Sequence, residues 1–271
     1  MKNIESSKSS QHNRYVMSQI IDILDLLNKF APKQALMQIR TQDTSKRPHN
    51  IPEEYIYAQF CGEVKRKAKI GTQDAMRKNL FVDIHRMGLI TRYDKDKNPI
   101  DPFASRKVKY VSLNKQGLKL INAKNILDQY FIFSKAIDTL LGGHIDIILD
   151  ILRDVDNNIG KINIYEYMFF VSAIDTNAGF NINIDMAIKL IKEYRILTTI
   201  QQKEVIETLK TDLRPKNYGG SRINKRDFHN WHNKAVQTYY LLNQTVYFET
   251  RQEKLVLKTE KIVLLLPTKQ D

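Results

Sequence analysis

The sequence predicts a mainly α-helical α+β protein with small β-hairpins, in which two winged-helix-like units are joined by a helical middle region. Two observations lead to this prediction. Apolar residues recur at spacings of three and four through most of the chain, as they do on the buried face of a helix. Near residue 90 and again near residue 250, this periodicity gives way to short runs of β-branched and aromatic residues that are typical of strands.

The chain is expected to divide into four regions. A polar N-terminal arm is followed by an amphipathic helix over residues 15–30 and a shorter helical stretch over residues 32–40. A winged-helix unit, a helical linking region and a second winged-helix-like unit come next, so that the complete division is residues 1–50, 51–123, 124–213 and 214–271. In the last region a basic loop, a helix over residues 224–242 and strand-like runs repeat the order of the second region.

The first winged-helix unit begins with two helices joined by a tight turn around Gly71. The second of these helices is predicted over residues 73–87, and Gly88 is placed to end it. Asp83 and Arg86 are expected on its outer faces, because its apolar residues form one buried stripe at spacings of four, four and three: Met76, Leu80, Ile84 and Met87.

A β-hairpin is predicted to follow, with strands over residues 89–93 and 107–113. The polar connection over residues 94–106 is a loop or wing, and Asn114 is placed to cap a short helix over residues 115–121. Two helices, a turn and a wing make the winged variant of the helix-turn-helix module, whose second helix can enter the major groove of DNA.

The charge of the chain predicts a polyanionic partner. Its 271 residues carry a formal net charge of +13, and the pI is about 9.6. Between residues 61 and 95, nine Lys and Arg residues, Arg92 among them, stand against four acids. A solvated helical surface is the simpler interpretation, but the basic excess falls on the second helix and the wing together. Double-stranded DNA is therefore the expected partner, with binding that weakens steeply as salt rises.

The residues expected to contact DNA lie on the second helix, on the wing and at the start of the second unit. Arg77 and Lys78 are expected at bases or phosphates, with Gln73 and Asp74 near base edges at the N-terminal end of the helix. The wing would hold the DNA backbone through Arg106, Lys107 and Lys109. The second unit would contribute Arg222, Lys225, Arg226, Asn230 and Lys234, while Trp231 packs inward.

The sequence shows no pattern of a catalytic or metal site. Cys61, the only cysteine, is expected to be a small buried side chain. His229 and His232 lack a further ligand at metal-binding spacing. Glu63-Val64-Lys65 has half of a nuclease motif, but it lies on a predicted helix. No cofactor is expected in this chain. No signal peptide or membrane-spanning run is recognisable, so the protein is expected in the cytoplasm, without a membrane partner.

The order of elements resembles the DNA-recognition region of type IIS restriction and nicking endonucleases of the AlwI-like group. The resemblance extends over roughly residues 50–265 and is carried by residues 72–80 running into 87–91, 110–118, 145–152 with 160–167, and 221–228 leading to 239–242 and 255–258. It implies sequence-specific binding of double-stranded DNA by the recognition portion of a type II restriction endonuclease.

The same resemblance implies a Mg²⁺-dependent cleavage domain after the recognition region, about where this chain ends. We therefore expect Mg²⁺ only with a nuclease domain or a separate nuclease subunit, and the chain to be a truncated enzyme, a recognition subunit or a free-standing DNA-binding protein. Two further functions stay open from the residues. One is a winged-helix replication initiator or transcriptional regulator. The other is a helical protein-interaction module whose basic surface meets an acidic protein.

Overall fold

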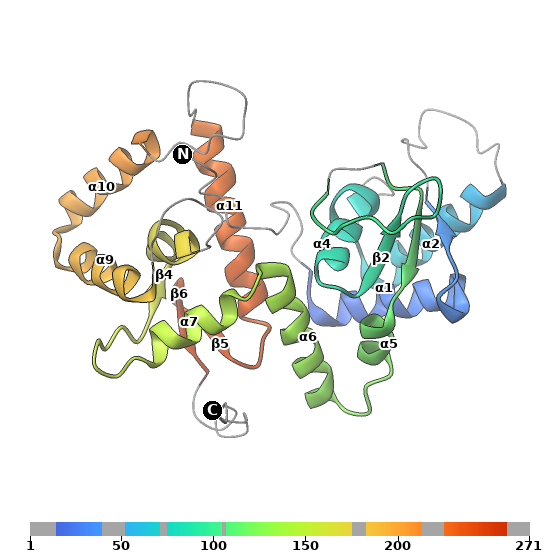
Figure 1. The fold of residues 1–271 in the computed structure, drawn as a ribbon, viewed down its shortest axis with the longest axis horizontal. Coiled ribbons are helices and arrows are strands. Elements are labelled where there is room, and N and C mark those ends of the chain that lie inside the picture. The colour runs from blue at the N-terminus through green and yellow to red at the C-terminus, as the bar shows by residue number, and fades with distance from the viewer. Residues whose placement is uncertain are drawn as a thin grey trace. The chain divides into compact units, whose positions relative to one another are not determined.

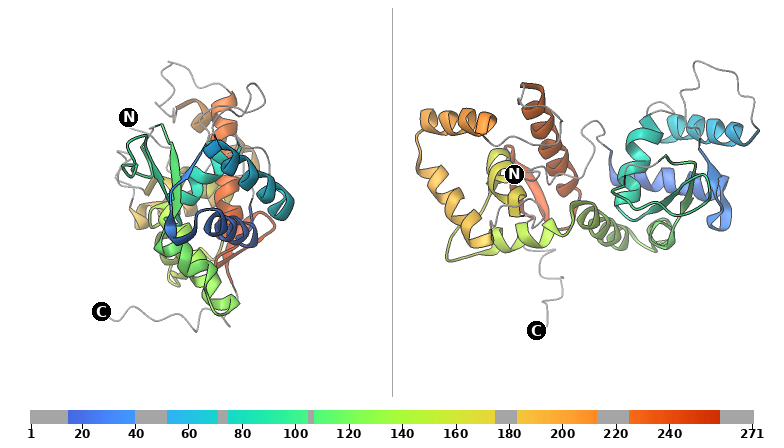
Figure 2. Two further views of the ribbon diagram at one scale, coloured as in Figure 1. Left: turned by 90° about the vertical axis from the view of Figure 1, so that its right-hand side faces the viewer. Right: turned by 45° about the horizontal axis from the view of Figure 1, so that its top comes forward.

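The fold consists of two units, which Figures 1 and 2 show as coloured ribbons. The computed structural model describes residues 15–39, 52–70, 75–104, 107–174, 183–212 and 225–258. Among the described residues, the N-terminal unit extends to Leu140 and the C-terminal unit begins at Leu141. Most described residues are helical, and each unit contains a small antiparallel sheet. The predicted α+β class is confirmed. None of the described helices is long and apolar enough to cross a membrane.

The helices of the N-terminal unit surround a core to which aromatic side chains contribute. Its helical elements are α1 (Met17–Phe30), α2 (Pro52–Ala68), the π-helical turn η3 (Met76–Leu80), α4 (Phe81–Arg86), α5 (Lys115–Ile121) and α6 (Ile126–Leu141). Helix α1 is amphipathic as predicted, and it packs against α2 and α5. The rings of Tyr57 and Phe60 from α2 lie 6.5 and 6.0 Å from that of Phe81, which joins α2 to α4.

The sheet of the N-terminal unit has three strands in the order β1-β3-β2. Strands β2 (Ile90–Tyr93) and β3 (Tyr110–Leu113) form the predicted hairpin, and β1 (Met37–Gln38) pairs with the other edge of β3. The helix predicted over residues 32–40 is wrong, because only Pro32–Gln34 form a 3₁₀ turn, η1, before β1 begins. A single helical turn makes too few backbone hydrogen bonds to compete with pairing to an existing strand.

The junction between β3 and α5 is tightly packed. Asn114 caps α5 as predicted, because its side-chain oxygen accepts hydrogen bonds from the backbone N–H groups of Gln116 and Gly117. A Cβ atom at Gly117 would lie only 2.2 Å from the carbonyl oxygen of Leu89. Gly88 has φ +70°, a conformation that favours glycine, and it follows α4 as predicted. These contacts fix α5 against the start of β2.

The C-terminal unit combines several helices with a second three-stranded sheet. Its elements are α7 (His144–Arg153), β4 (Ile162–Asn163), α8 (Ile164–Glu166), η4 (Tyr167–Val171), η5 (Ser172–Ile174), α9 (Ile184–Ile196), α10 (Thr199–Asp212), α11 (Lys225–Leu242), β5 (Phe248–Arg251) and β6 (Lys254–Leu257). The predicted linking region is not all-helical, because β4 pairs with β6. Of the region predicted over residues 214–271, residues 214–224 and 259–271 lie outside the described residues.

The two units share one topology. In each, a helix leads to a short strand, further helices follow, and a closing hairpin places its last strand beside the first one, in the orders β1-β3-β2 and β4-β6-β5. The registers correspond, since Met37 pairs with Val111 and Ile162 pairs with Leu255. The units differ in their hairpins: residues 94–109 join β2 to β3, whereas Gln252 and Glu253 alone join β5 to β6.

Candidate nucleic-acid interface

The predicted apolar stripe of the second helix is buried as expected. Met76, Leu80, Ile84 and Met87 are each no more than 2% exposed. Phe81 is also fully buried, which the spacing rule did not predict. The reason is the π-helical turn η3, in which the backbone N–H of Phe81 donates to the carbonyl of Met76, five residues back. The wider turn adds one residue to the inward face of the helix.

Two of the predicted contact residues lie together on that π-helical turn. Arg77 is half-buried and Lys78 is exposed, both within η3. Gln73 and Asp74, expected at the N-terminal end of the same helix, lie outside the described residues. Their expected contacts with DNA, and those of Arg77 and Lys78, stay predictions.

The segment that enters β3 carries two further predicted residues. Lys107 is exposed and Lys109 is half-buried, while Arg106 lies outside the described residues. The backbone of Lys109 is held at both ends: its N–H donates to the carbonyl of Tyr93, and its carbonyl accepts from the N–H of Ile39, both at 2.8 Å. Its side chain therefore starts from a fixed point of the sheet.

Asp83 does not lie on an outer face, as the sequence suggested. It is fully buried, and one carboxylate oxygen accepts a hydrogen bond from the hydroxyl of Tyr15 at 2.8 Å. Burial and the charge of Asp83 hold the pKa of Tyr15 well above its usual range, so the hydroxyl stays protonated and can donate. Tyr15 precedes α1 in sequence, so only the tertiary fold brings it to α4. Asp83 is therefore a core residue.

Arg92 and Arg86 are also withdrawn from the surface that the sequence suggested. Arg92 is 6% exposed, and its Nε donates to Nδ1 of His85 at 2.8 Å. Burial first, and then the charge of Arg92, lower the pKa of His85 to about 4, so its ring is neutral near pH 7 and can accept this bond. Arg86 is half-buried. The basic surface near α4 is therefore smaller than the residue count implied.

The connection between β2 and β3 is ordered by its own hydrogen bonds where it is described. Oδ1 of Asp94 accepts from the backbone N–H groups of Asp96 and Asn98, both at 2.9 Å. The N–H of Ile100 donates to the carbonyl of Arg92 at 2.9 Å, and the Ile100 side chain is 3% exposed. The connection thus folds back onto β2 at its start.

The corresponding helix of the C-terminal unit is α11, and its buried face is aromatic. Trp231 is 5% exposed, which confirms that it packs inward, and its ring lies 5.5 Å from Phe169 and 6.1 Å from Phe228. His232 is half-buried, with its ring 5.9 Å from that of Tyr165. His229 is exposed. The two histidines thus differ in environment.

The remaining predicted DNA contacts belong to this helix or precede it. Lys234 is half-buried, and burial lowers its pKa. The backbones of Lys225, Arg226 and Asn230 lie in α11, but their side chains are outside the described part of the chain, as is all of Arg222. The expected DNA contacts of this group stay predictions.

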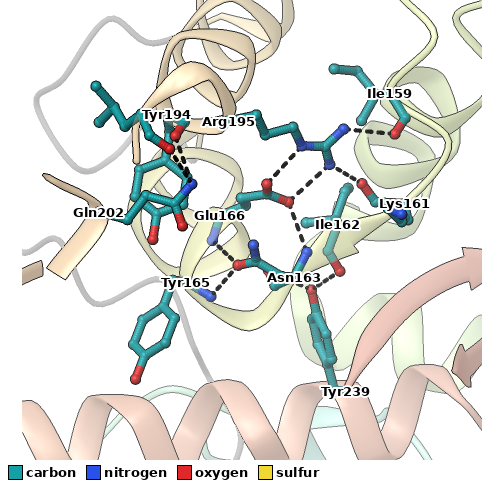
Figure 3. A network of polar contacts seen from close by, with 11 residues as sticks. Ile159, Lys161, Ile162, Asn163, Tyr165, Glu166, Tyr194, Arg195, Gln202 and Tyr239 are labelled. Atoms are coloured by element: carbon teal, nitrogen blue, oxygen red, sulfur yellow. Dashed lines mark hydrogen bonds and ion pairs between the residues drawn. The ribbon is translucent and has the colours of Figure 1, made fainter. Parts of the chain in front are cut away.

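A polar network centred on Glu166 joins the elements around α11 (Figure 3). The Glu166 side chain is 2% exposed and accepts from Nε and Nη2 of Arg195 at 2.8 and 3.0 Å. The same guanidinium donates to the carbonyls of Ile159, at 2.9 Å, and Lys161. The C-terminal end of α9 is thereby tied to the segment before α8.

The sequence carries a signal for one part of this network. Asn163 accepts from the backbone N–H groups of Tyr165 and Glu166, and Glu166 accepts from the N–H of Asn163, which makes a capping box. The Asn-x-x-Glu spacing is typical of this motif. The hydroxyl of Tyr239 lies 2.8 and 2.9 Å from the carbonyls of Ile162 and Asn163 and donates to them, which fixes α11 on β4 (Figure 3). The partners Arg195 and Tyr239 are too distant in sequence to be found from spacing.

The described residues do not offer a site for the Mg²⁺ ion that the resemblance implies for cleavage. Glu63, Val64 and Lys65 lie on helix α2, and Glu63 accepts from Nη2 of Arg66 at 2.6 Å. No group of three or more His, Cys, Asp or Glu side chains within the described ranges could hold a metal ion.

Cys61 is 6% exposed, and burial raises its pKa to about 12, which confirms a small buried thiol.

Comparison with known proteins bears on the N-terminal unit. The sequence model of a family described as the type IIS restriction enzyme MboII middle domain matches residues 16–124. This part of the chain is related to type IIS restriction enzymes. The match begins just before α1 and ends before α6, so it spans the complete β1-β3-β2 sheet and the helices around it. No curated protein and no solved structure matches the chain significantly.

Proposed function

We propose that the chain binds double-stranded DNA at a specific sequence, as the recognition part of a type IIS restriction endonuclease. The observation that carries this proposal is that the match to a restriction-enzyme domain coincides with one structural unit. The order of elements in that unit is helix, strand, two helices and a hairpin with sheet order β1-β3-β2. This order supports the proposal of a winged helix-turn-helix. The AlwI-like grouping remains a prediction beside this match.

The helical segment η3–α4 takes the place of the recognition helix in this proposal. Its inward face is closed by apolar side chains, and Arg77 and Lys78 lie on the turn near its N-terminal end. Recognition helices contact base edges mainly through their N-terminal residues. Gln73 and Asp74 precede this turn in sequence and would extend the contact.

Residues 94–109 take the place of the wing. Lys107 and Lys109 lie at its return to β3, where the backbone of Lys109 is fixed. Lysines in such a place neutralise phosphates and add affinity for every sequence alike, whereas a paired arginine at a base edge adds specificity. Arg106 would join the two lysines. The net charge of +13 supports attraction to DNA as a whole.

The C-terminal unit is proposed as a second DNA-binding unit, because it repeats the topology of the first. Its hairpin closes through Gln252 and Glu253 alone, so it has no wing, and contact would rest mainly on α11. The expected contributors there are Arg222, Lys225, Arg226, Asn230 and Lys234. Cleavage would need a nuclease domain or a separate nuclease subunit that holds Mg²⁺. The protein would act in the cytoplasm.

The test is selection of bound duplexes from a random library at ~150 mM salt, where non-specific binding is weak. We expect one enriched motif. The Arg77→Ala variant should then lose roughly 1–3 kcal/mol of discrimination between the motif and single-base variants. Lys189→Ala, at an exposed position of α9 paired with Glu193, is the control and should bind as the wild type does. Absence of enrichment contradicts sequence-specific binding, and a uniform loss in Arg77→Ala would make Arg77 a phosphate contact.

A further inference from the structure

Two arginine side chains meet at one backbone carbonyl in the connection between β2 and β3. Nη2 of Arg92 lies 3.4 Å and Nε of Arg86 lies 3.5 Å from the carbonyl oxygen of Pro102. These are long hydrogen bonds, but both donors are charged. The Nε of Arg92 also donates to His85, which fixes the guanidinium in place. The helix α4 and the strand β2 thus hold the same point of the connection.

The next residue of the connection is an exposed aromatic one. Phe103 is 47% exposed, and the guanidinium carbon of Arg86 lies 5.4 Å from the centre of its ring, a cation–π distance. Its backbone N–H donates to Oδ1 of Asp101 at 2.8 Å. One side of the ring is therefore supported by Arg86, while much of the side chain is open to solvent.

The arrangement draws two arginines away from water, and the carbonyl of Pro102 is an acceptor that offsets this. Arg86 and Arg92 are both withdrawn from water, and Asp83 is the fully buried carboxylate beside them. Withdrawing arginines from water is unfavourable unless their N–H groups find acceptors. The C-terminal unit closes the equivalent hairpin with Gln252 and Glu253 alone. The difference between the two hairpins indicates that the longer connection does more than join β2 to β3.

Resting on the proposed function, we propose that Arg86 and Arg92 are positioning residues that hold residues 94–104 of the wing, and that this part of the wing presents Phe103 as an uncharged contact to duplex DNA. An aromatic ring held at a wing can pack on deoxyribose or on a base step in the minor groove, where phenylalanine side chains wedge in other DNA-binding proteins. Phe103 would add affinity without neutralising a phosphate.

The positioning part is tested without DNA, by hydrogen exchange of the wing amides. In Arg92→Lys and Arg92→Gln, the N–H groups of Ile100 and Phe103 should exchange about tenfold faster than in the wild type, since their protection reports local opening. Lysine keeps the charge of Arg92 but lacks its planar set of N–H donors. Fast exchange of the wing amides in Arg92→Lys would therefore show that the shape of the arginine, and not its charge alone, holds the wing. The N–H of Ala31, bonded to Leu27 at the end of α1, is the internal reference.

Arg86→Gln provides a second variant, because Arg86 is half-buried and its replacement is less disruptive than that of the buried Arg92. It should also speed wing exchange while the reference amide is unchanged. Wing amides that exchange at the wild-type rate in both Arg86→Gln and Arg92→Lys would overturn the positioning role.

The contact part is tested with the duplex enriched by selection. Phe103→Ala should weaken binding about tenfold, with Phe103→Leu intermediate, as expected for loss of an aromatic contact. The slope of log K against log salt should be unchanged, whereas Lys109→Ala should reduce it by about one because it loses a phosphate contact. Leu127→Ala, at a similarly exposed apolar residue of α6 with 42% exposure, is the matched control and should bind as the wild type does.

The outcomes separate this proposal from the proposed function. If the wild type binds the enriched duplex and Phe103→Ala binds equally well, the Phe103 contact is overturned and sequence-specific binding stands. If the wild type enriches no duplex, the proposed function and the Phe103 contact fail together. Hydrogen exchange then still decides whether the two arginines hold the wing.

Discussion

The guanidinium of Arg195 donates to both carboxylate oxygens of Glu166 while only 2% of the Glu166 side chain is exposed. Arg195 comes from the end of α9 and Glu166 from the end of α8, and the two are 29 residues apart. Two further N–H groups of Arg195 donate to the carbonyls of Ile159 and Lys161. Both charges of this ion pair thus have hydrogen-bond partners. The pair joins α9 to α8 and to the segment before β4.

Arg195→Met should lower the free energy of unfolding of the C-terminal unit by roughly 3–5 kcal/mol, because it leaves the carboxylate of Glu166 buried without its cation. Urea unfolding followed by the fluorescence of Trp231, the only tryptophan and a residue of this unit, measures the change. Lys189→Met is the control, since it removes only the exposed pair with Glu193, which should be worth less than about 1 kcal/mol. Equal midpoints for the two variants would show that the Glu166 pair does not stabilise the unit.

His85 should make the N-terminal unit less stable as the pH falls. Its pKa is about 4 in the folded protein, against an ordinary 6.5, so between these values the unfolded chain binds the proton that the folded one does not. The contribution of neutral His85 to the free energy of unfolding is fully present above pH 6.5. It is lost progressively as the pH falls from 6.5 through the folded pKa of about 4. Between pH 7 and pH 5 the loss from this residue should be about 2 kcal/mol.

Comparison of the wild type with His85→Gln isolates this effect, because glutamine offers Arg92 an acceptor but does not titrate. Denaturant unfolding followed by circular dichroism at pH 7 and pH 5 should show a smaller loss for His85→Gln. His229→Gln, at an exposed position of α11, serves as the control and should keep the wild-type difference between the two pH values. A His85→Gln curve that parallels the wild type would contradict a buried, neutral His85.

Gly117→Ala should destabilise the N-terminal unit by roughly 1–3 kcal/mol, because the added methyl group has no space. Its Cβ would lie 2.2 Å from the carbonyl oxygen of Leu89 and 2.6 Å from Cδ1 of Leu113. Gly62→Ala on α2 is the matched control, since nothing lies within 4 Å of the added Cβ and alanine favours a helix. Thermal unfolding by circular dichroism should therefore shift down for Gly117→Ala and stay or rise for Gly62→Ala.

Local patterns predicted much of the fold. The helix before β2 was found with its stripe, because periodicity and the glycine at its end are features of neighbouring residues. Strands β1 and β4 were missed because each has two residues and is defined by pairing with β3 or β6, far along the chain. The surface charges were predicted less well. Asp83 and Arg92 looked like surface charges, but both are buried, where Asp83 contacts Tyr15 and Arg92 contacts His85.

The sequence by itself determined most of the helices, both hairpins and the basic character, because propensity, periodicity and charge belong to local stretches of chain. The relation of residues 16–124 to type IIS restriction enzymes came from comparison with a family model. The tertiary structure decided which charges are buried, that both sheets share one strand order, and that the first hairpin alone carries a long connection held by two arginines. Burial and long-range pairing depend on which segments meet, and no local pattern contains that information.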